Sequence, residues 1–160
     1  MESSNFVYQG TFTDIAAGQQ LSAQLYDRGV NVIFSAAGAV GTGVIKEARE
    51  RAQAGKTAWV IGVDVDQYDD GIYSEGPSVV LTSAMKKIST ATFDVISQSV
   101  QENFPRGEIL SYSAKNDGVG IPAENPNLSS ETVERVNEVY AQIKEGSSTI
   151  QDYGEGLINA

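Results

Sequence analysis

The chain has 160 residues, enough for one folded core, and it contains no apolar run near the ~18 residues of a membrane-spanning helix. Its formal net charge is −10, with 21 acidic and 11 basic residues, which disfavours nucleic acid and anionic lipid as partners. Cys and His are both absent. Disulfides, thiolate metal sites and Ser-His-Asp catalysis are therefore excluded, and a zinc site is disfavoured.

The N-terminal segment predicts a strand, a turn and a helix. The first ten residues contain neither a basic stretch nor an apolar run, so we expect no secretion signal in this chain. Asn5 to Gly10 has the composition of a short strand that ends in a turn. Thr13 or Asp14 can cap a helix that begins near Ile15, and Gly29 is suited to end it.

A βαβ unit follows and organises the rest of the chain. Val30 to Phe34 is a continuous run of β-branched and aromatic residues, which predicts a central, buried strand. A glycine turn leads to a helix over residues 44–53, and Ala58 to Val63 predicts the next buried strand. Two such strands joined by a helix are typical of a parallel pair.

The remaining elements continue the alternation. In order they are an acidic loop (64–76), a strand (78–83), a long amphipathic helix (86–103), a weaker strand (108–113), a Pro- and Gly-containing linker (118–130), a helix (131–144) capped by Ser130, and a polar tail. Alternation of this kind favours an α/β fold with a three-layer, mostly parallel sheet. We expect residues 1–160 to form a single domain.

The glycine turn and Asp64 are the first candidates for a binding site. Gly38, Gly41 and Gly43 follow one strand, and Asp64 ends the next, so both lie where open α/β sheets bind ligands. Helix N-terminal N–H groups beside a glycine turn can face a ligand, and a carboxylate suits the vicinal hydroxyls of a ribose. The alternatives are a turn that only reverses the chain and an aspartate that only caps it.

A calcium loop is a weaker interpretation of the acidic segment. Counted from Asp64, Asp66 and Glu75 fall at positions 3 and 12 of an EF-hand loop. Position 5 is Tyr68 and position 6 is Asp69, where that loop requires an oxygen ligand and then glycine. We therefore expect no metal ion and no cofactor.

Lys86 and Phe12 complete the candidate set. Lys86 is expected at a helix N-terminus, where a cation is unfavourable, and such local conflicts often mark functional positions. It could contact a polar ligand or neutralise Asp64; the alternative is a solvated lysine. Phe12 lies among small polar residues, so its ring either packs on the following helix or stacks on a planar base.

Four segments resemble a known family. They are Y-x-G-[ST]-F-x-D at Tyr8–Asp14, VNVIFSAAGAVGTGVIKEA, VIGVDVDQ and VVLTSAMKK, and DGVGIPAENPNLSSETVERVNEVYAQIKEG resembles the same family's C-terminal end. Together they are similar to the second half of the basic membrane lipoprotein family, the PnrA-like substrate-binding proteins of nucleoside ABC importers.

The resemblance implies a lobe of a type I periplasmic-binding-protein fold, in a truncated form. It places residues 5–83 in one lobe core, 84–121 in a segment of the missing partner lobe, and 122–160 in a linker, a final helix and a tail. It also implies a purine nucleoside held by the Phe12 ring, the Gly38 backbone, Asp64 at the ribose and Lys86 as a second polar contact. The full-length parent would be a lipoprotein at the cell surface or in the periplasm that serves an ABC permease.

Three function classes follow from these observations. The first is a non-enzymatic binding module of an importer. The second is a nucleotide-cofactor oxidoreductase that uses the Gly38–Gly43 turn and Asp64, although no Tyr-x-x-x-Lys pair is present. The third is a sensor lobe, which would need a DNA-binding segment. We also expect that residues 86–121, without their own core, either pack back on the sheet or form a homodimer by segment exchange.

Overall fold

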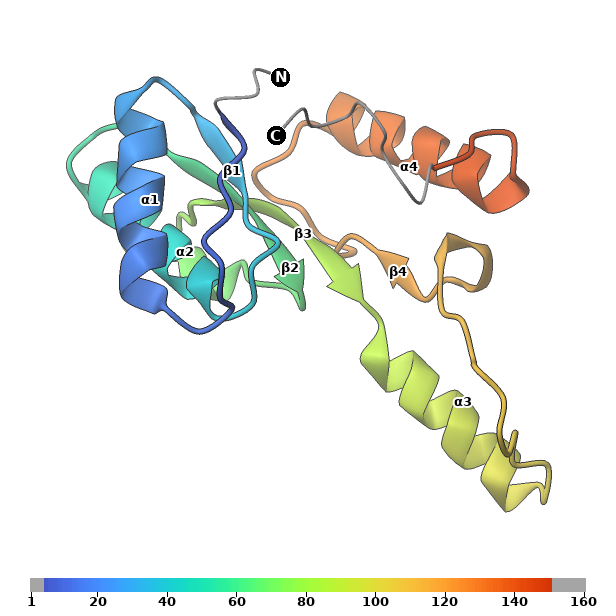
Figure 1. Ribbon diagram of the computed structural model, residues 1–160. Helices are drawn as coiled ribbons and strands as arrows, with labels where there is room; N and C mark the ends of the chain where they lie inside the picture. Colours follow the sequence, from blue (N-terminus) through green and yellow to red (C-terminus); the bar gives the residue numbers. More distant parts are fainter. Residues whose placement is uncertain (1–4, 151–160) are drawn as a thin grey trace.

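A mostly parallel four-stranded sheet forms the centre of the molecule, seen here in a computed structural model that describes residues 5–150 (Figure 1). The elements are α1 (Ile15–Asp27), β1 (Val32–Phe34), α2 (Val40–Gln53), β2 (Trp59–Asp64), the 3-10 turn η2 (Asp69–Gly71), β3 (Val80–Lys86), α3 (Ile88–Val100), the 3-10 turn η3 (Ala114–Asn116), β4 (Val119–Gly120) and α4 (Ser130–Glu145).

The strand order is β1-β2-β3-β4, with the first three strands parallel and β4 antiparallel to β3. This confirms the predicted α/β class with a mostly parallel sheet. The prediction that Val30–Phe34 is central and buried is wrong, because β1 is an edge strand. Ile33 is buried against the helices, whereas Val32 and Phe34 on the opposite face are 41% and 57% exposed. A continuous apolar run does not by itself show whether both neighbours of a strand are present.

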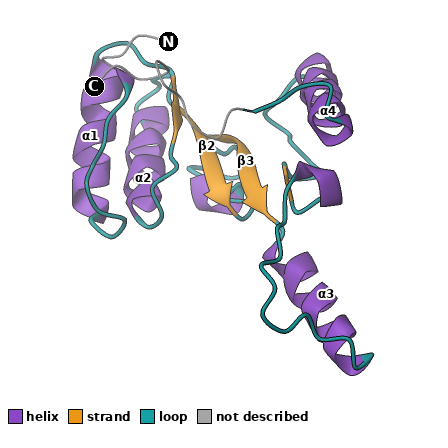
Figure 2. Cartoon of the chain, turned by 45° about the vertical axis from the view of Figure 1, so that its right-hand side comes forward, coloured by secondary structure: helices purple, strands orange, loops and turns teal. Residues whose placement is uncertain are grey.

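Helices α1 and α2 lie together against one face of the sheet (Figure 2). Asp14 caps α1 as predicted, accepting a hydrogen bond from the Ala17 N–H at 2.9 Å, and Gly29 follows the helix with φ +89°. The buried core lies between these helices and the sheet and is aliphatic, with Tyr26 at its edge. It comprises Leu25, Tyr26, Ile33, Val44, Ile45, Ala48, Ala58, Val60, Val79 and Val80.

The two helices approach each other closely because glycine lies on each side of their contact. A Cβ on Gly18 would collide with the Val40 carbonyl, and a Cβ on Gly43 would collide with the Ile15 carbonyl and lie 2.8 Å from the Gln19 nitrogen. Gly43 is therefore a helix-packing residue. It belongs to α2, which begins four residues before the predicted start.

Two predicted strands are absent from the described part of the chain. Residues 5–10 form an irregular segment in which the Thr11 N–H binds the Gln9 side-chain oxygen. Residues 108–113 are also irregular, and Ile109 is 98% exposed. Both have strand-like composition, but a strand is made by paired backbone hydrogen bonds, and neither segment forms such a ladder within the described residues.

The chain leaves the sheet at the end of β3 and returns beside it. β3 extends to Lys86, and α3 begins at Ile88, so the prediction that Lys86 opens the helix is wrong. On the return path Val119 pairs with Lys86, and the Lys87 N–H donates to the Gly118 carbonyl at 2.9 Å. These two paired connections, Lys86–Lys87 and Gly118–Gly120, are called the neck below.

Helix α3 projects away from the sheet beyond the neck (Figure 1), and none of its residues is buried. Phe93 and Val100 are 74% and 78% exposed. The expectation that this helix turns an apolar face inward is therefore wrong. Of the segment 86–121, β4 does return to the sheet beside β3, but α3 does not pack on it. The returning chain contacts the helix, where the Tyr112 hydroxyl donates to the Asp94 carboxylate at 2.8 Å, but Phe93 and Val100 stay largely exposed.

The last helix follows the predicted pattern closely. Ser129 caps α4 one residue before the predicted cap, and Gly146 follows it in the left-handed conformation with φ +80°. The helix packs against η3. The predicted tail extends through residues 151–160, which lie outside the described residues.

Candidate functional site

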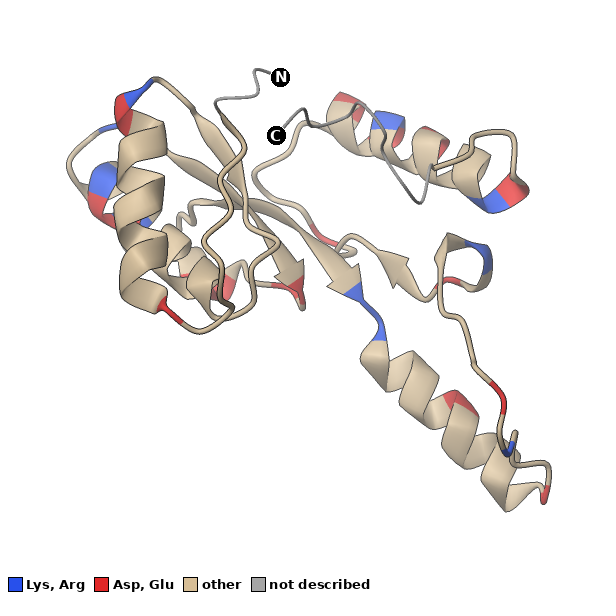
Figure 3. Ribbon diagram, in the orientation of Figure 1, with Lys and Arg blue, Asp and Glu red and all other residues tan. Residues whose placement is uncertain are grey.

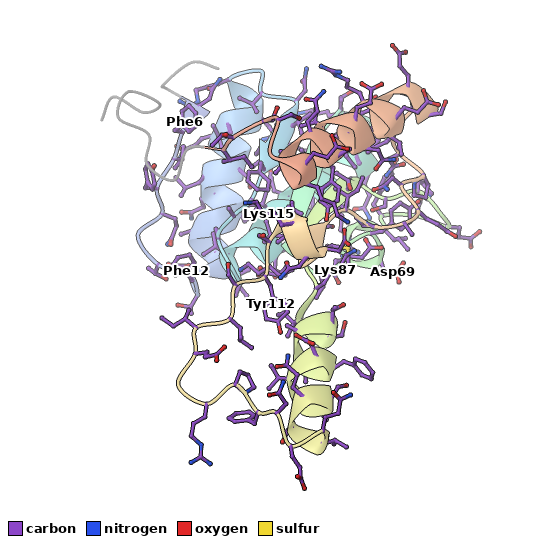
Figure 4. The ribbon with its side chains drawn as sticks, turned by 90° about the vertical axis from the view of Figure 1, so that its right-hand side faces the viewer. Phe6, Phe12, Asp69, Lys87, Tyr112 and Lys115 are labelled. Atoms are coloured by element: carbon purple, nitrogen blue, oxygen red, sulfur yellow. The ribbon has the colours of Figure 1, made fainter. Side chains whose placement is uncertain are left out.

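The carboxyl ends of β1, β2 and β3 point to the same end of the sheet, and the four predicted ligand residues lie at this end. Gly38 follows β1, Asp64 is the last residue of β2, and Lys86 is the last residue of β3. Phe12 precedes α1 and reaches the same end through Gly38. Figure 4 shows Phe12 and Lys87 at this end of the sheet, above the projecting α3. The parallel topology therefore places residues as far apart in sequence as Phe12 and Lys86 at the same end of the sheet.

Phe12 and Gly38 form the first contact in this site. Gly38 has φ +56°, and a Cβ there would lie 3.3 Å from both the Cβ and the carbonyl oxygen of Phe12. Glycine is thus favoured at this position for two reasons: the positive φ, and the close approach of Phe12 to the site that a Cβ would occupy. The Phe12 side chain is not buried by this contact, since the residue is 70% exposed. Its ring is therefore available to a ligand.

Asp64 and Lys86 form the second contact. The Lys86 ammonium lies 2.8 Å from Asp64 Oδ1, and their side chains are 69% and 44% exposed, respectively. Figure 3 shows the pair as an acidic end of β2 beside a basic end of β3. An exposed ion pair of this kind contributes little to stability, about 0–1 kcal/mol. The pair can exchange part of its contact for a polar ligand at small cost.

The glycine turn does not present a phosphate-binding cradle. The N–H groups of Val40, Gly41 and Thr42 already bind the carbonyls of residues 37, 38 and 39 at 3.0–3.3 Å. The predicted free N–H groups at this helix end are therefore occupied, because the first turn is wound tightly. Only Gly38 of the three glycines lies in the turn itself; Gly41 and Gly43 belong to α2.

Ser35 is a residue that the sequence prediction missed. It follows β1, is 6% exposed, and its Oγ has no hydrogen-bond partner within residues 5–150. A Cβ on Gly41 would lie 2.8 Å from this oxygen, so the glycine makes room for the hydroxyl. The available signal was a small polar residue directly after a buried strand. It supplies an uncommitted donor and acceptor beneath the glycine turn.

The acidic loop does not assemble a metal site. Within residues 5–150 no three acidic side chains gather closely enough to hold a metal ion. Asp66 instead accepts a hydrogen bond from the Tyr68 N–H at 3.1 Å, and Asp70 accepts one from Gln67 at 3.3 Å. Asp66 and Asp70 therefore stabilise local turns of this loop.

Within residues 5–150, no helix combines the length and apolar character that crossing a membrane requires.

A separate hollow of about 330 Å³ lies beside the neck, between β4 and α4. Its walls are Lys87, Asp117, Val119, Gly120, Ile121, Pro122, Ala123, Asn125, Val133, Val136, Asn137 and Tyr140. None of the four predicted ligand residues lines it. Among these wall residues, Asp117 accepts hydrogen bonds from Lys144 Nζ at 2.7 and 2.8 Å and from the Tyr140 hydroxyl at 3.1 Å.

The pKa of Asp117 is lowered, first by the hydrogen bond from Lys144 and then by that from Tyr140. The folded state therefore favours the carboxylate. Its contribution to holding α4 is present above the ordinary pKa of 3.8 and is lost as the pH falls through the lower folded-state value.

We expect acid to release α4 from η3 before the sheet unfolds. Amide hydrogen exchange in α4 should accelerate relative to β2 when the pH falls from about 6 to about 2.5, after correction for intrinsic exchange rates. In Asp117→Asn the α4 protection should be low throughout and should not change relative to β2. A pH response of equal size in that variant would assign the effect to another group.

Comparisons with known proteins place these features in a family. A family model described as ABC transporter substrate-binding protein PnrA-like matches residues 4–153. The ABC transporter nucleoside-binding protein BmpA of Lactococcus lactis is 35% identical over 151 residues, covering 89% of this chain and 42% of BmpA. The CD4+ T-cell-stimulating antigen of Listeria monocytogenes is 32% identical, covering 91% of this chain and 42% of the antigen.

Solved structures agree at the level of the fold. An ABC transporter solute-binding protein from Aeropyrum pernix superposes with a TM-score of 0.72 at 24% identity, covering 92% of this chain and 48% of the other. A transcriptional activator of the comK gene from Bacillus halodurans gives 0.73 at 19% identity, covering 90% and 47%. This chain spans about two fifths of the curated relatives named above (42% of each). The oxidoreductase alternative finds no support in any of these matches.

Proposed function

The chain belongs to the PnrA-like family of ABC transporter substrate-binding proteins, and on this premise we propose that it supplies one wall of a purine nucleoside site. The observation that carries the proposal is the meeting of Phe12, Gly38, Asp64 and Lys86 at one end of the sheet. BmpA of Lactococcus lactis, a relative whose match covers 89% of this chain, is an ABC transporter nucleoside-binding protein.

Each of the four residues has a distinct part in this proposal. The exposed Phe12 ring offers a flat apolar face for a purine base, and stacking of this kind contributes about 1–3 kcal/mol. The Asp64 carboxylate accepts hydrogen bonds from the two ribose hydroxyls. Lys86, held 2.8 Å from Asp64, fixes that carboxylate and donates to a ligand oxygen. Gly38 allows the ring to approach the turn.

The proposed role is binding and delivery without catalysis. Substrate-binding proteins of ABC transporters generally hand their ligand to a permease unchanged, and an exposed Asp-Lys pair is adequate for that task. The permease is accordingly the proposed macromolecular partner. We place the parent protein outside the cytoplasmic membrane as a lipoprotein of the cell surface or periplasm, with residues 5–83 in one lobe, 84–121 in a segment of the partner lobe, and 122–160 as linker, final helix and tail.

Titration calorimetry with inosine, guanosine and adenosine tests the proposal. Because the proposed site contacts both the ribose and the base, a nucleoside should bind more tightly than its free base. It should also bind more tightly than its 2′,3′-blocked derivative. The matched comparisons are between the affinities for guanosine and guanine and between those for adenosine and adenine. Equal affinity for a nucleoside and its 2′,3′-blocked derivative would contradict the assignment of Asp64 to the ribose.

Phe12→Ala should weaken nucleoside binding by about tenfold, because it removes the stacking face at the cost of about 1–2 kcal/mol. Phe12→Tyr should retain most of the affinity, since the ring face is kept. Unfolding should shift little in either variant because the ring is 70% exposed. An unchanged affinity in Phe12→Ala would remove the ring from the site.

The projecting segment supports a second part of the proposal, a homodimer formed by segment exchange. Ile88, Phe93, Ile96 and Val100 on α3 are 57–78% exposed, and a second copy could cover them. Light scattering across a concentration series should show a dimer that dissociates on dilution. Replacing Phe93 and Val100 with serine should leave a monomer of unchanged sheet stability. A monomer at all concentrations in the unmodified chain would contradict the exchange.

A further inference from the structure

The backbone of Asp64 is in an unusual conformation. It has φ +72°, a region that non-glycine residues seldom occupy, and the Val65 N–H donates to the Val63 carbonyl at 2.9 Å across it. A hydrogen bond between residues two apart around a positive φ is the mark of the rarer, strained γ-turn. Such a conformation costs about 1–3 kcal/mol and persists only where surrounding groups hold it.

The Gln67 side chain folds back over this turn and fastens it. Its Oε1 accepts a hydrogen bond from the Val63 N–H at 3.0 Å, immediately before Asp64. Its own backbone N–H donates to the Ser83 Oγ at 3.0 Å, and Ser83 is fully buried in β3. One residue therefore ties the start of the turn to the neighbouring strand, from which Lys86 also extends.

Gly62 provides the space that this arrangement needs. A Cβ at Gly62 would lie 2.6 Å from the Gln67 Oε1 and 2.8 Å from the Ser83 Oγ, the same two oxygens that hold the turn. Gly62 does not have a positive φ, so its glycine is required by this packing alone. The side chain of Gln67 and the absence of one at Gly62 are thus complementary.

We propose that Gln67 is a positioning residue, which holds the Asp64 turn so that the carboxylate meets Lys86 and the ligand. It acts through Asp64 and does not itself need to touch the ligand. The inference rests on the proposed nucleoside site, but its geometrical part concerns only Val63, Asp64, Gln67 and Ser83.

Two variants of Gln67 distinguish the effect of its hydrogen-bond acceptor from the effect of its side-chain size. Gln67→Met keeps the length of the side chain and removes the acceptor, whereas Gln67→Glu keeps an acceptor for the Val63 N–H. We expect Gln67→Met to weaken inosine binding at least fivefold and Gln67→Glu to weaken it less, since the acceptor is kept although the new carboxylate faces Asp70. In an Asp64→Ala background, Gln67→Met should cause no further loss, because its effect passes through Asp64.

A second measurement reads the turn without any ligand. The positive φ of Asp64 gives a strong intraresidue amide–Hα NOE, which should weaken in Gln67→Met and in Gly62→Ala and persist in Gln67→Glu. Loss of this NOE together with the coupled loss of affinity supports the proposal. A wild-type chain that binds no nucleoside, with the NOE still lost in Gln67→Met, would refute the nucleoside site and support the positioning. A retained NOE, or an additive loss in the Asp64→Ala background, would overturn the positioning.

Discussion

Replacing Asp64 with alanine is expected to weaken purine nucleoside binding by about 100-fold. Two hydrogen bonds from ribose hydroxyls to a carboxylate contribute about 1.5 kcal/mol each, and their sum corresponds to roughly two factors of ten. The loss also leaves the Lys86 ammonium, which lies 2.8 Å from Asp64 Oδ1, without its counter-ion in the site. Titration calorimetry with inosine gives the change directly.

Two control variants distinguish the effect of losing the Asp64 carboxylate from effects on the backbone conformation and on the net charge. Asp64→Asn keeps a residue that tolerates positive φ, so an affinity between that of the wild type and Asp64→Ala is expected. Glu75→Ala removes the same charge from an exposed position of the acidic loop and should leave binding unchanged. Tight binding in Asp64→Ala would reject the ribose contact, and a large loss in Glu75→Ala would point to general electrostatics instead.

Gly43→Ala is expected to destabilise the fold by about 2–3 kcal/mol, through forced separation of α1 and α2. The added Cβ would collide with the Ile15 carbonyl and lie 2.8 Å from the Gln19 nitrogen, both backbone atoms that cannot rotate away. Helix propensity alone predicts the opposite sign, a gain of about 1 kcal/mol on replacing a helical glycine with alanine. The sign of the change therefore decides between the two effects.

Denaturant unfolding followed by circular dichroism measures this difference, with Thr42→Ala as the matched variant. Thr42 precedes Gly43 on the same helix turn and is exposed, so its replacement should change stability by no more than about 0.5 kcal/mol. A stabilised Gly43→Ala would show that the helices are not in close contact there.

The βαβ unit was predictable from the sequence because its signals are local. Alternating apolar runs and helical spacing mark β1, α2 and β2, and Asp14 and Gly29 mark the two ends of α1. The same logic placed Gly38 and Asp64 at the carboxyl ends of parallel strands, where the structure also has them. Lys86 was expected to open a helix, whereas it is the last residue of β3. That the residues contact a ligand there stays a prediction.

The wrong predictions share a cause, because they concern segments whose structure depends on neighbouring elements rather than on their own sequence pattern. Within residues 5–150, the segments 5–10 and 108–113 have strand composition but form no strand, and no residue of the amphipathic α3 is buried. The run at Val30–Phe34 gave no sign that β1 is an edge. The glycines after β1 suggested one turn, whereas Gly43 serves helix packing, a distinction that only the position of α1 could make.

Gln67 and Ser35 were missed in the sequence for a different reason, because the local signals that they carry are weak. A glutamine in an acidic loop and a serine after a strand are each common in solvated turns. Gln67 matters through its hydrogen bonds to the Val63 N–H and the Ser83 hydroxyl, and Ser35 through a buried Oγ that has no partner within residues 5–150; neither property is encoded by spacing. Strained positions such as Asp64 likewise show themselves only through φ.

The neck gives the projecting segment an unusual independence. Lys86 pairs with Val119, and the Lys87 N–H binds the Gly118 carbonyl, so the two ends of residues 88–117 are already side by side. Closing a loop of this length costs little more entropy than closing a much shorter one. The segment is therefore separable from the sheet, although not from α4: replacing it with a two-residue turn would join β3 and β4 as a hairpin and keep the candidate site, but α4 would lose its contacts with η3 and Asp117.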